Sequence, residues 1–474
     1  MYRFRKVKYL LDEKYDELNN QEIYLASAEE LNDPMEGVRD IFWQGDEVLW
    51  RNFIKHYLMC LEHVISMWNV VGEEKEINKD FIMAFKNSIE FSSVKHKERF
   101  IKIEDYFFSN KIISSMPAFL AHKNRKIRYR ELFKYLKVIH KFAFDSINFV
   151  NTNYGYMERI NIFKNISDKY SSDGESSVRL LASTEDKEEC IDDDFVLEDE
   201  IEKLFNSLNS INSEHELLNS YDNKSEQSIS NEKFIIVQFP EAYLSKMEEI
   251  VHPRWYSASF MDGCRSVASW SSYGDNHRGV CLKFKTNIGE NNNSQSMKLK
   301  GIIRNGVHSV IGDKEHQLVK IKYDDKLKEI DFFKSLGRMS FPKFNEQWYA
   351  NENGEISSTV YNLNFDEEWL QCYRKDFYKS ITSKSMEYSH EGEYRIILDE
   401  IFDDYSCPEE RKLKYDFDDL DAIIFGIKTS SIDKENIIKI IRKKCRESGR
   451  QHFDFYQAEY SHESGKIEQI KIYG

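Results

Sequence analysis

Cysteine pairs with metal-binding spacing are missing from this chain. Its seven cysteines, at positions 60, 190, 264, 281, 372, 407 and 445, are scattered and form no Cys-x-x-Cys or Cys/His pattern. That excludes the usual tetrahedral zinc site, and we expect folding without metal or disulfide staples in a reducing cytosol.

Long apolar runs are also missing. No stretch approaches the roughly 18 continuous apolar residues that span a bilayer. The basic start, Met1 to Lys8, lacks the apolar core and cleavage site of a signal peptide. We therefore expect a cytoplasmic protein with no membrane contact.

Positive charge is in deficit. Lysine and arginine number 67 against 82 acidic residues, so the formal net charge is -15. Because such a chain repels a phosphate backbone, general nucleic-acid binding is disfavoured. The run 123–130, the most basic in the chain, is the one stretch through which nucleic acid could be contacted. We favour the simpler interpretation, the solvated face of a helix, because charge runs are usually that.

Apolar and aromatic residues are plentiful enough for a packed core. Hydrophobic residues make up 41% and aromatic residues 14% of the 474 positions. This composition argues against a disordered chain despite its 31% charged residues. Large parts of the chain should be globular.

The periodicity of the apolar residues divides the chain into three parts. Strand patterns near the start, and again after residue 233, predict one α+β domain with a mixed or antiparallel sheet, formed by 1–45 and 233–474. Period-3.6 patterns predict a helical insertion over 46–165. Residues 166–232 are acidic and rich in Ser and Asn, which predicts a partly mobile segment, with an amphipathic helix over 196–208.

The strands and helices expected in the α+β domain are the following. Strands are predicted over 2–7, 22–27, 234–239, 255–260, 279–284, 393–398, 422–427, 453–459 and 466–472, and helices over 9–18, 366–381 and 434–445.

Four stretches together resemble one bacterial family, domain-of-unknown-function family 2971. They are the opening strand Tyr2–Arg5 with the later Asn32-Asp33-Pro34-Met35-Glu36 turn, the run Trp270–Phe284, the run Tyr388–Arg395 and the strand Ile423–Gly426. The family usually has Trp where this chain has Tyr388. The resemblance implies an effector of a bacterial antiviral defence or toxin system, and nothing transfers to residues from about 40 to 232.

A more remote similarity is to mono-ADP-ribosyltransferases of the Arg-Ser-Glu type. The matching order here is Arg3 or Arg5, then Ser257-Ala258-Ser259, then Glu391-Gly392-Glu393. This resemblance implies an ADP-ribosyltransferase-like fold and cleavage of NAD.

The chemistry of these residue types suits that reaction. A carboxylate such as Glu393 can hold the ribose and stabilise the oxocarbenium-like transition state, while Glu391 can activate the incoming nucleophile. Arg3 or Arg5 would anchor the pyrophosphate through paired donors, because a guanidinium does so better than an ammonium. Ser257 and Ser259 are expected beside the nicotinamide ribose.

The same residues have simpler interpretations. Glu391, Glu393 and Arg395 could alternate along one strand and form a salt-bridged, exposed edge, with Arg3 and Arg5 as their partners. The 32–36 turn could hold a hard cation through carboxylate and amide oxygens, or could only start a helix.

Three further residues are of types that contact ligands. Asn32, Tyr273 and His277 are candidates for contacting the cofactor. His277 could instead only complete a turn in which Gly279 supplies the unusual backbone angle.

Three hypotheses follow for the function. The first is an NAD-using ADP-ribosyltransferase-like effector in which the helical insertion binds a protein partner, forms an oligomer or restrains activity. The second is a metal-dependent nuclease with Asn32, Asp33, Glu36, Glu391 and Glu393 as ligands. The third is a non-catalytic sensor or assembly subunit of a defence complex.

Overall fold

The computed structural model describes most of the chain. The described residues are 1–31, 33, 36, 38–72, 74–84, 93–155, 203, 226–289, 294–305, 308–324, 329–337, 345–360, 363, 366–401 and 403–473. The helix expected over 196–208, apart from residue 203, and Asn32 lie outside them.

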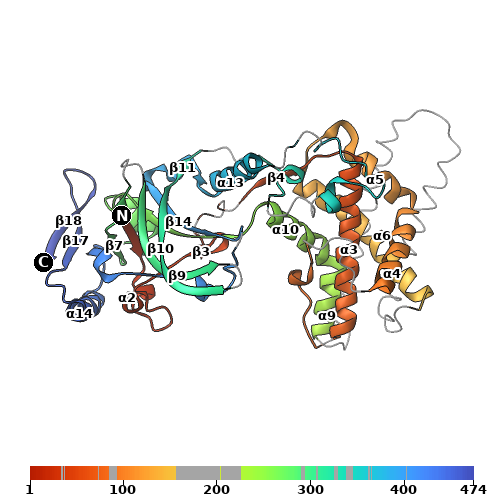
Figure 1. The fold of residues 1–474 in the computed structure, drawn as a ribbon. Coiled ribbons are helices and arrows are strands. Elements are labelled where there is room, and N and C mark those ends of the chain that lie inside the picture. The colour runs from red at the N-terminus through yellow and green to blue at the C-terminus, as the bar shows by residue number, and fades with distance from the viewer. Residues whose placement is uncertain are drawn as a thin grey trace. The chain divides into compact units, whose positions relative to one another are not determined.

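The chain divides into two compact units. The first, the sheet unit, consists of Met1–Arg39, Pro253–Lys328 and Lys375–Gly474, and the second, the helical unit, of Asp40–His252 and Glu329–Arg374. The fold is therefore mixed α+β, with an α+β unit interrupted by helices. Both ends of the chain belong to the sheet unit (Figure 1).

A curled, mixed sheet forms most of the sheet unit. Its neighbouring strands run in the order β18-β17-β16-β7-β1-β6-β14-β10-β9-β15-β2, with β3 on β6 and β8 on β9. These strands are β1 (Tyr2–Arg5), β2 (Glu22–Tyr24), β3 (Ala26–Ser27), β6 (Trp255–Met261), β7 (Val280–Phe284), β8 (Asn287–Ile288), β9 (Gln295–Asn305), β10 (His308–Lys320), β14 (Glu393–Asp399), β15 (Lys412–Tyr415), β16 (Leu420–Phe425), β17 (Asp454–Tyr460) and β18 (Ile467–Tyr473).

Shorter elements complete the sheet unit. A separate parallel pair is formed by β11 (Lys322–Tyr323) and β13 (Ser383–Lys384). The helices are α1 (Val7–Leu11), α2 (Glu17–Asn20), α11 (Val267–Ser272), α14 (Ser431–Ser448) and the short 3-10 turns η1 (Ala28–Glu30), η7 (Met386–Glu391), η8 (Pro408–Arg411) and η9 (Phe417–Asp419).

The position of β6 next to β1 decides where the site forms. β6 pairs with β14 along its whole length, from Glu393↔Met261 to Asp399↔Trp255. On its other edge it pairs with β1 only at Tyr2↔Met261, and with β3 at Ala26↔Ser257. β1 instead pairs fully with β7, so β1 and β6 diverge after their first residue pair.

Long helices form the helical unit. They are α3 (Glu47–Val71), α4 (Val94–Phe108), α5 (Lys111–Ala121), α6 (Tyr129–Asn153), α9 (Glu226–Lys233) and α10 (Phe239–Val251), and α13 (Glu367–Ile381) begins in this unit (Figure 1). Smaller elements are β4 (Asp40–Trp43), β5 (Ile127–Arg128), β12 (Glu329–Asp331), η2 (Lys79–Phe81), η3 (His122–Asn124), η4 (Phe234–Gln238), η5 (Phe332–Lys334) and η6 (Asn345–Tyr349).

The strand predicted over 234–239 is wrong. Phe234–Gln238 is a π-helical segment that joins α9 to α10. Its run of apolar residues is buried among the helices, with Ile235 fully buried. A short apolar run fits a buried strand or a buried helix equally well, and here the surrounding helices decide.

The unit limits differ from the expected ones in three stretches. Residues 40–45, 233–252 and 329–374 belong with the helices rather than with the sheet. The reason is packing, because Phe239, Phe332, Phe333 and Trp348 are buried in the core cluster that holds α3 and α6. The sheet unit has cores of its own, with members such as Phe260 and Trp270.

Candidate functional site

The last turn before β14 brings charged residues together in the sheet unit. Glu391 ends η7, Gly392 takes a positive φ of 56°, and Glu393 starts β14. A side chain at residue 392 would be strained and would meet the carboxylate of Asp262, so the position suits glycine. This turn lets Glu391 and Glu393 both contact one ammonium group, that of Lys384.

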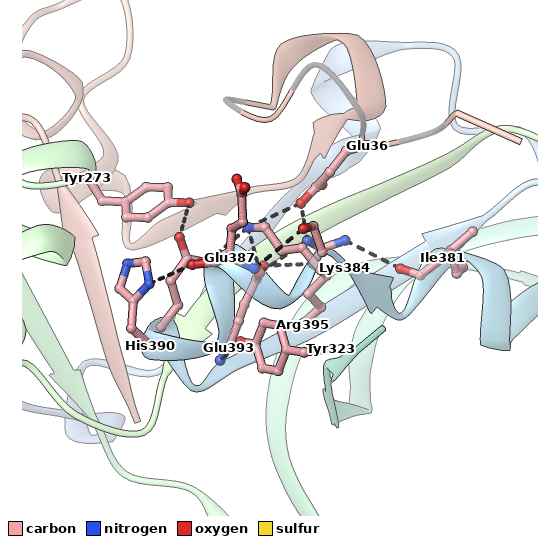
Figure 2. A network of polar contacts seen from close by, with 11 residues as sticks. Glu36, Tyr273, Tyr323, Ile381, Lys384, Glu387, His390, Glu393 and Arg395 are labelled. Atoms are coloured by element: carbon pink, nitrogen blue, oxygen red, sulfur yellow. Dashed lines mark hydrogen bonds and ion pairs between the residues drawn. The ribbon is translucent and has the colours of Figure 1, made fainter. Parts of the chain in front are cut away.

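Five buried side chains form what we call the charge cluster: Glu36, Lys384, Glu391, Glu393 and Arg395. Nζ of Lys384 lies 2.9 Å from Oε2 of Glu391, 3.1 Å from Oε2 of Glu393 and 3.3 Å from Oε1 of Glu36. Arg395 donates to Glu393 at 2.7 Å and also pairs with Glu36. Figure 2 shows Glu36, Lys384, Glu393 and Arg395 gathered into one network.

The cluster fixes the ionisation of its members. Burial opposes the charge on Glu393, but Arg395, Lys384 and the Ser259 hydroxyl bring its pKa down to about 2. Burial raises the pKa of Glu36, aided by Glu393 and opposed by Arg395. One Glu36 oxygen, Oε2, is buried and has no hydrogen-bond partner in the part of the chain that the structure describes. Glu393 is thus an ionised carboxylate at neutral pH.

Two tyrosines border the charge cluster. The Tyr273 hydroxyl donates to Oε1 of Glu391 at 2.8 Å, and the Tyr323 hydroxyl accepts from the backbone N–H of Glu393 at 2.8 Å. Burial, together with Glu391, raises the pKa of Tyr273, so the phenol stays a donor. In Figure 2 Tyr273 points its hydroxyl toward the network.

A pocket opens where β1 and β6 diverge, and we call it the strand pocket. It has a volume of about 200 Å³, and its lining includes Arg3, Arg5, Ser257, Ser259 and Tyr273. The pocket and the charge cluster adjoin, because Ser259 bonds to Glu393 and Tyr273 bonds to Glu391.

The two arginines reach this region from the opposite face of the sheet. Residues that pair across antiparallel strands share a face, so Tyr2 and Phe4 lie on the face of Met261, and Arg3 and Arg5 start from the other one. Arg3 is buried and donates to the carbonyls of Ser259 at 3.2 Å and Tyr24 at 3.1 Å.

Arg5 is held by an acidic partner. It donates through Nε to Glu17 at 2.8 Å and pairs with the same carboxylate through Nη2, and its guanidinium lies 4.4 Å from the centre of the Tyr9 ring. The salt-bridged interpretation is right for Arg395 with Glu393, but these side chains are buried rather than on an exposed edge, and Glu391 lies in η7 rather than on the strand. Arg3 and Arg5 are not their partners, because neither forms an ion pair with Glu391 or Glu393 among the described residues.

Ser257 carries a hydroxyl with no partner. Its side chain is buried, it lines the strand pocket, and its Oγ finds no hydrogen-bond partner among the described residues. Buried hydroxyls normally form hydrogen bonds, so this hydroxyl is available to form one with a ligand.

His277 lies on the turn before β7, and it is not among the described residues that line the strand pocket. Its ring stacks on buried Trp270 with centroids 6.4 Å apart, and its φ is 71°. Asp275 and Asn276 also have positive φ, so the unusual backbone angles fall on these residues rather than on Gly279.

The residues named for a metal site converge only in part. Glu36, Glu391 and Glu393 meet, but they meet at the ammonium of Lys384. No group of three or more His, Cys, Asp or Glu side chains in the described part of the chain is arranged to hold a metal ion.

The basic run 123–130 is partly neutralised within the helical unit. Arg125 pairs with Glu131, Lys126 with Glu329, and Arg128 with Asp40 at 2.9 Å as well as with Glu329. These pairs reduce the positive charge that it could offer to a phosphate backbone.

Sequence reasoning missed Lys384 and Tyr323. Both lie on the two-residue strands β13 and β11, which pair with each other away from the main sheet. Neither strand has a periodicity long enough to detect, and a single lysine seven residues before an acidic turn carries no signal.

Comparison with known proteins agrees with the resemblance over part of this region. Residues 269–396 match the model of a family described as "Protein of unknown function (DUF2971)". This span is about a quarter of the chain and contains the Trp270–Phe284 and Tyr388–Arg395 stretches.

The family match is the extent of the likeness found. No curated protein and no solved structure matches the chain. In the described residues, no helix is both long and apolar enough to cross a membrane.

Proposed function

We propose that the sheet unit cleaves the nicotinamide glycosidic bond of NAD in the manner of an ADP-ribosyltransferase. The main support is that three separate segments, containing Arg3, Ser257–Ser259 and Tyr273, line one pocket that adjoins Glu391 and Glu393. On this proposal the chain is an effector of a bacterial antiviral defence or toxin system.

The strand pocket has features of a binding site for an anion. Arg3 is 6% exposed, and no carboxylate of the described residues forms an ion pair with it. The nearby carboxylate of Glu17 acts on Arg3 electrostatically but is paired with Arg5. A buried guanidinium without a direct ion pair is costly, and a phosphate can relieve that cost through paired hydrogen bonds. Arg3 is thus our candidate for the pyrophosphate contact, whereas Arg5 already forms an ion pair with Glu17.

The pocket suits one end of a dinucleotide. Its volume, about 200 Å³, is below the roughly 300 Å³ at which pockets that enclose a whole drug-sized ligand begin. We propose that the nicotinamide ribose enters the pocket, where the unpartnered Ser257 hydroxyl can bond to it.

The electrostatics favour a positive charge next to the pocket. Counted as ionised, the cluster has three carboxylates and two cations, which leaves a net charge of −1. When the bond from the ribose C1′ to the nicotinamide nitrogen breaks, its electron pair leaves with nicotinamide and the ribose becomes cationic. Glu393 stabilises that cation from behind Ser259. The acceptor then bonds to C1′, and its proton passes to solvent water.

The test is release of nicotinamide from NAD, measured by chromatography. Glu393→Gln keeps the shape of the side chain, removes the charge and should lower the rate by about 100-fold or more. Glu435→Gln is the matched control, because that carboxylate is 70% exposed on α14 and only pairs with Lys439. Circular dichroism and the unfolding midpoint confirm that each variant is folded.

Two results would overturn the proposal. One is NAD recovered intact after incubation with the folded wild-type chain. The other is wild-type release by folded Glu393→Gln. Ser257→Ala gives an independent check, since it removes no charge from the cluster and should raise KM more than it lowers kcat.

We propose that the helical unit contacts a target protein or another copy of the chain. It has its own core, built around α3 and α6. All residues of the strand pocket and of the charge cluster belong to the sheet unit. The site is therefore complete without a partner bound to the helical unit.

A further inference from the structure

Lys384 is the common partner of all three carboxylates in the charge cluster. It follows Ser383 on β13, its side chain is 3% exposed, and its Nζ lies within 3.3 Å of oxygens of Glu36, Glu391 and Glu393. The ring of Tyr388 also lies 4.5 Å from Nζ. The strand pocket lining does not include Lys384 among the described residues, so it acts on a ligand only through other groups.

The second cation of the cluster does not duplicate these contacts. Arg395 pairs with Glu36 and with Glu393, while Glu391 has Lys384 as its one ion-pair partner among the described residues. The link between Glu391 and Glu393 therefore passes through Lys384. Glu391 in turn receives the hydroxyl of Tyr273, which lines the pocket.

Loss of this ammonium would leave the cluster unbalanced. Three buried carboxylates with Arg395 alone carry a net charge of −2 when ionised. Because like charges and burial both favour protonation, at least one carboxyl would take up a proton at a higher pH than it does now. The groups that face Nζ and set this balance are Glu36, Tyr273, Tyr323, Tyr388, Glu391, Glu393 and Arg395.

We propose that Lys384 is a positioning residue, which holds the carboxylates of Glu391 and Glu393 side by side behind the wall of the strand pocket. The role of Lys384 in catalysis rests on the proposed function. Lys384 touches no substrate, and its effect reaches the ribose through Glu393 and reaches the pocket wall through Glu391 and Tyr273.

The first measurement is the pH profile of kcat/KM for nicotinamide release. Lys384→Met keeps the chain length and removes the charge, and it should move the acidic limb upward by about one pH unit or more. Lys384→Arg restores a cation and should return the limb toward its wild-type position. Lys439→Met is the control, since Lys439 is 72% exposed and pairs only with Glu435.

A lower rate with an unmoved acidic limb in folded Lys384→Met would overturn the proposal. A purely structural salt bridge predicts that result, because it would change the amount of active enzyme and not its titration.

The second measurement needs no catalytic activity, so it separates failure of this inference from failure of the proposed function. It is a double-mutant cycle on the urea unfolding midpoint with Lys384→Met, Glu391→Gln and the double variant. If Lys384 and Glu391 stabilise the fold through their ion pair, the midpoint of the double variant should be shifted much less than the sum of the two single shifts. Additive shifts would overturn the inference, even where the wild-type chain releases nicotinamide.

Discussion

The charge on Glu393 should stabilise the sheet unit in a strongly pH-dependent way, which Glu393→Gln can reveal. In the fold its pKa is about 2, against 4.5 for an ordinary glutamate. At 1.36 kcal/mol per pH unit, this difference corresponds to about 3 kcal/mol. Since the carboxylate is 2% exposed, solvent screens little of it.

The sign follows from the lowered pKa. A depressed pKa in the folded state stabilises the fold above the unfolded-state value, and this contribution disappears as pH falls through the folded-state value. Wild type should therefore exceed Glu393→Gln by about 3 kcal/mol at pH 7 and by nearly as much at pH 5. The difference should fall to about half near pH 3.3.

The neighbour Glu36 acts in the opposite direction. Burial and Glu393 raise its pKa, so its ionised form destabilises the fold at neutral pH. Comparison of wild type with Glu393→Gln at each pH largely removes that background, although removal of the Glu393 charge also lowers the pKa of Glu36 and slightly reduces the difference.

The assay is urea unfolding followed by tryptophan fluorescence, because urea does not screen charges as guanidinium chloride does. We expect the two units to unfold in separate transitions, and the sheet-unit transition is the one that Glu62→Gln, in the helical unit, leaves in place. Glu435→Gln, at an exposed position, should leave both transitions in place. A wild-type advantage that stays constant from pH 7 to pH 3, or no advantage at pH 7, would refute the reasoning.

Three other changes should have measurable effects. Gly392→Ala forces a side chain into positive φ against Asp262, so it should cost roughly 1–2 kcal/mol in urea unfolding and lower nicotinamide release. Gly465→Ala, at a similar φ and with only the Tyr460 hydroxyl within 4.0 Å, should spare activity. Glu62→Gln removes a 1%-exposed carboxylate that pairs with Arg99 and should destabilise the helical unit by about 3 kcal/mol, seen as protease sensitivity of the helices. On the proposed function, Arg3→Lys should weaken NAD binding, measured as a raised KM, more than the same change at Arg5 does.

Much of the sheet unit could be predicted from local patterns. Three predicted strands correspond closely to observed ones: 255–260 to β6, 393–398 to β14 and 453–459 to β17. Alternating or β-branched apolar residues between turn signals favour a strand over other secondary structure. The helices at 366–381 and 434–445 likewise correspond to α13 and α14. The long hairpin of β9 and β10 was not predicted, since most of β10 is exposed and alternates poorly.

The candidate site could be predicted only in part from the sequence. Order and residue type predict Arg3 or Arg5 together with Ser257 and Ser259, and Tyr273 is a separate candidate ligand contact; all of them line one pocket. The sequence could not predict that Arg3 starts from the face of the sheet opposite to that of Met261, because this depends on the register of β1 against β6 and β7. Registers are set by pairing between segments that are far apart in the chain.

By itself, the sequence determined the acidic balance, the alternation of strand-rich and helix-rich parts, and the Glu391-Gly392-Glu393 turn, because composition, periodicity and turn chemistry are local properties. Only the tertiary structure decided that residues 329–374 join the helices and that Lys384 lies between the carboxylates of Glu36, Glu391 and Glu393. The reason is physical: a buried ammonium and three carboxylates stabilise one another only when distant segments bring them within about 3 Å, and no local pattern encodes that distance.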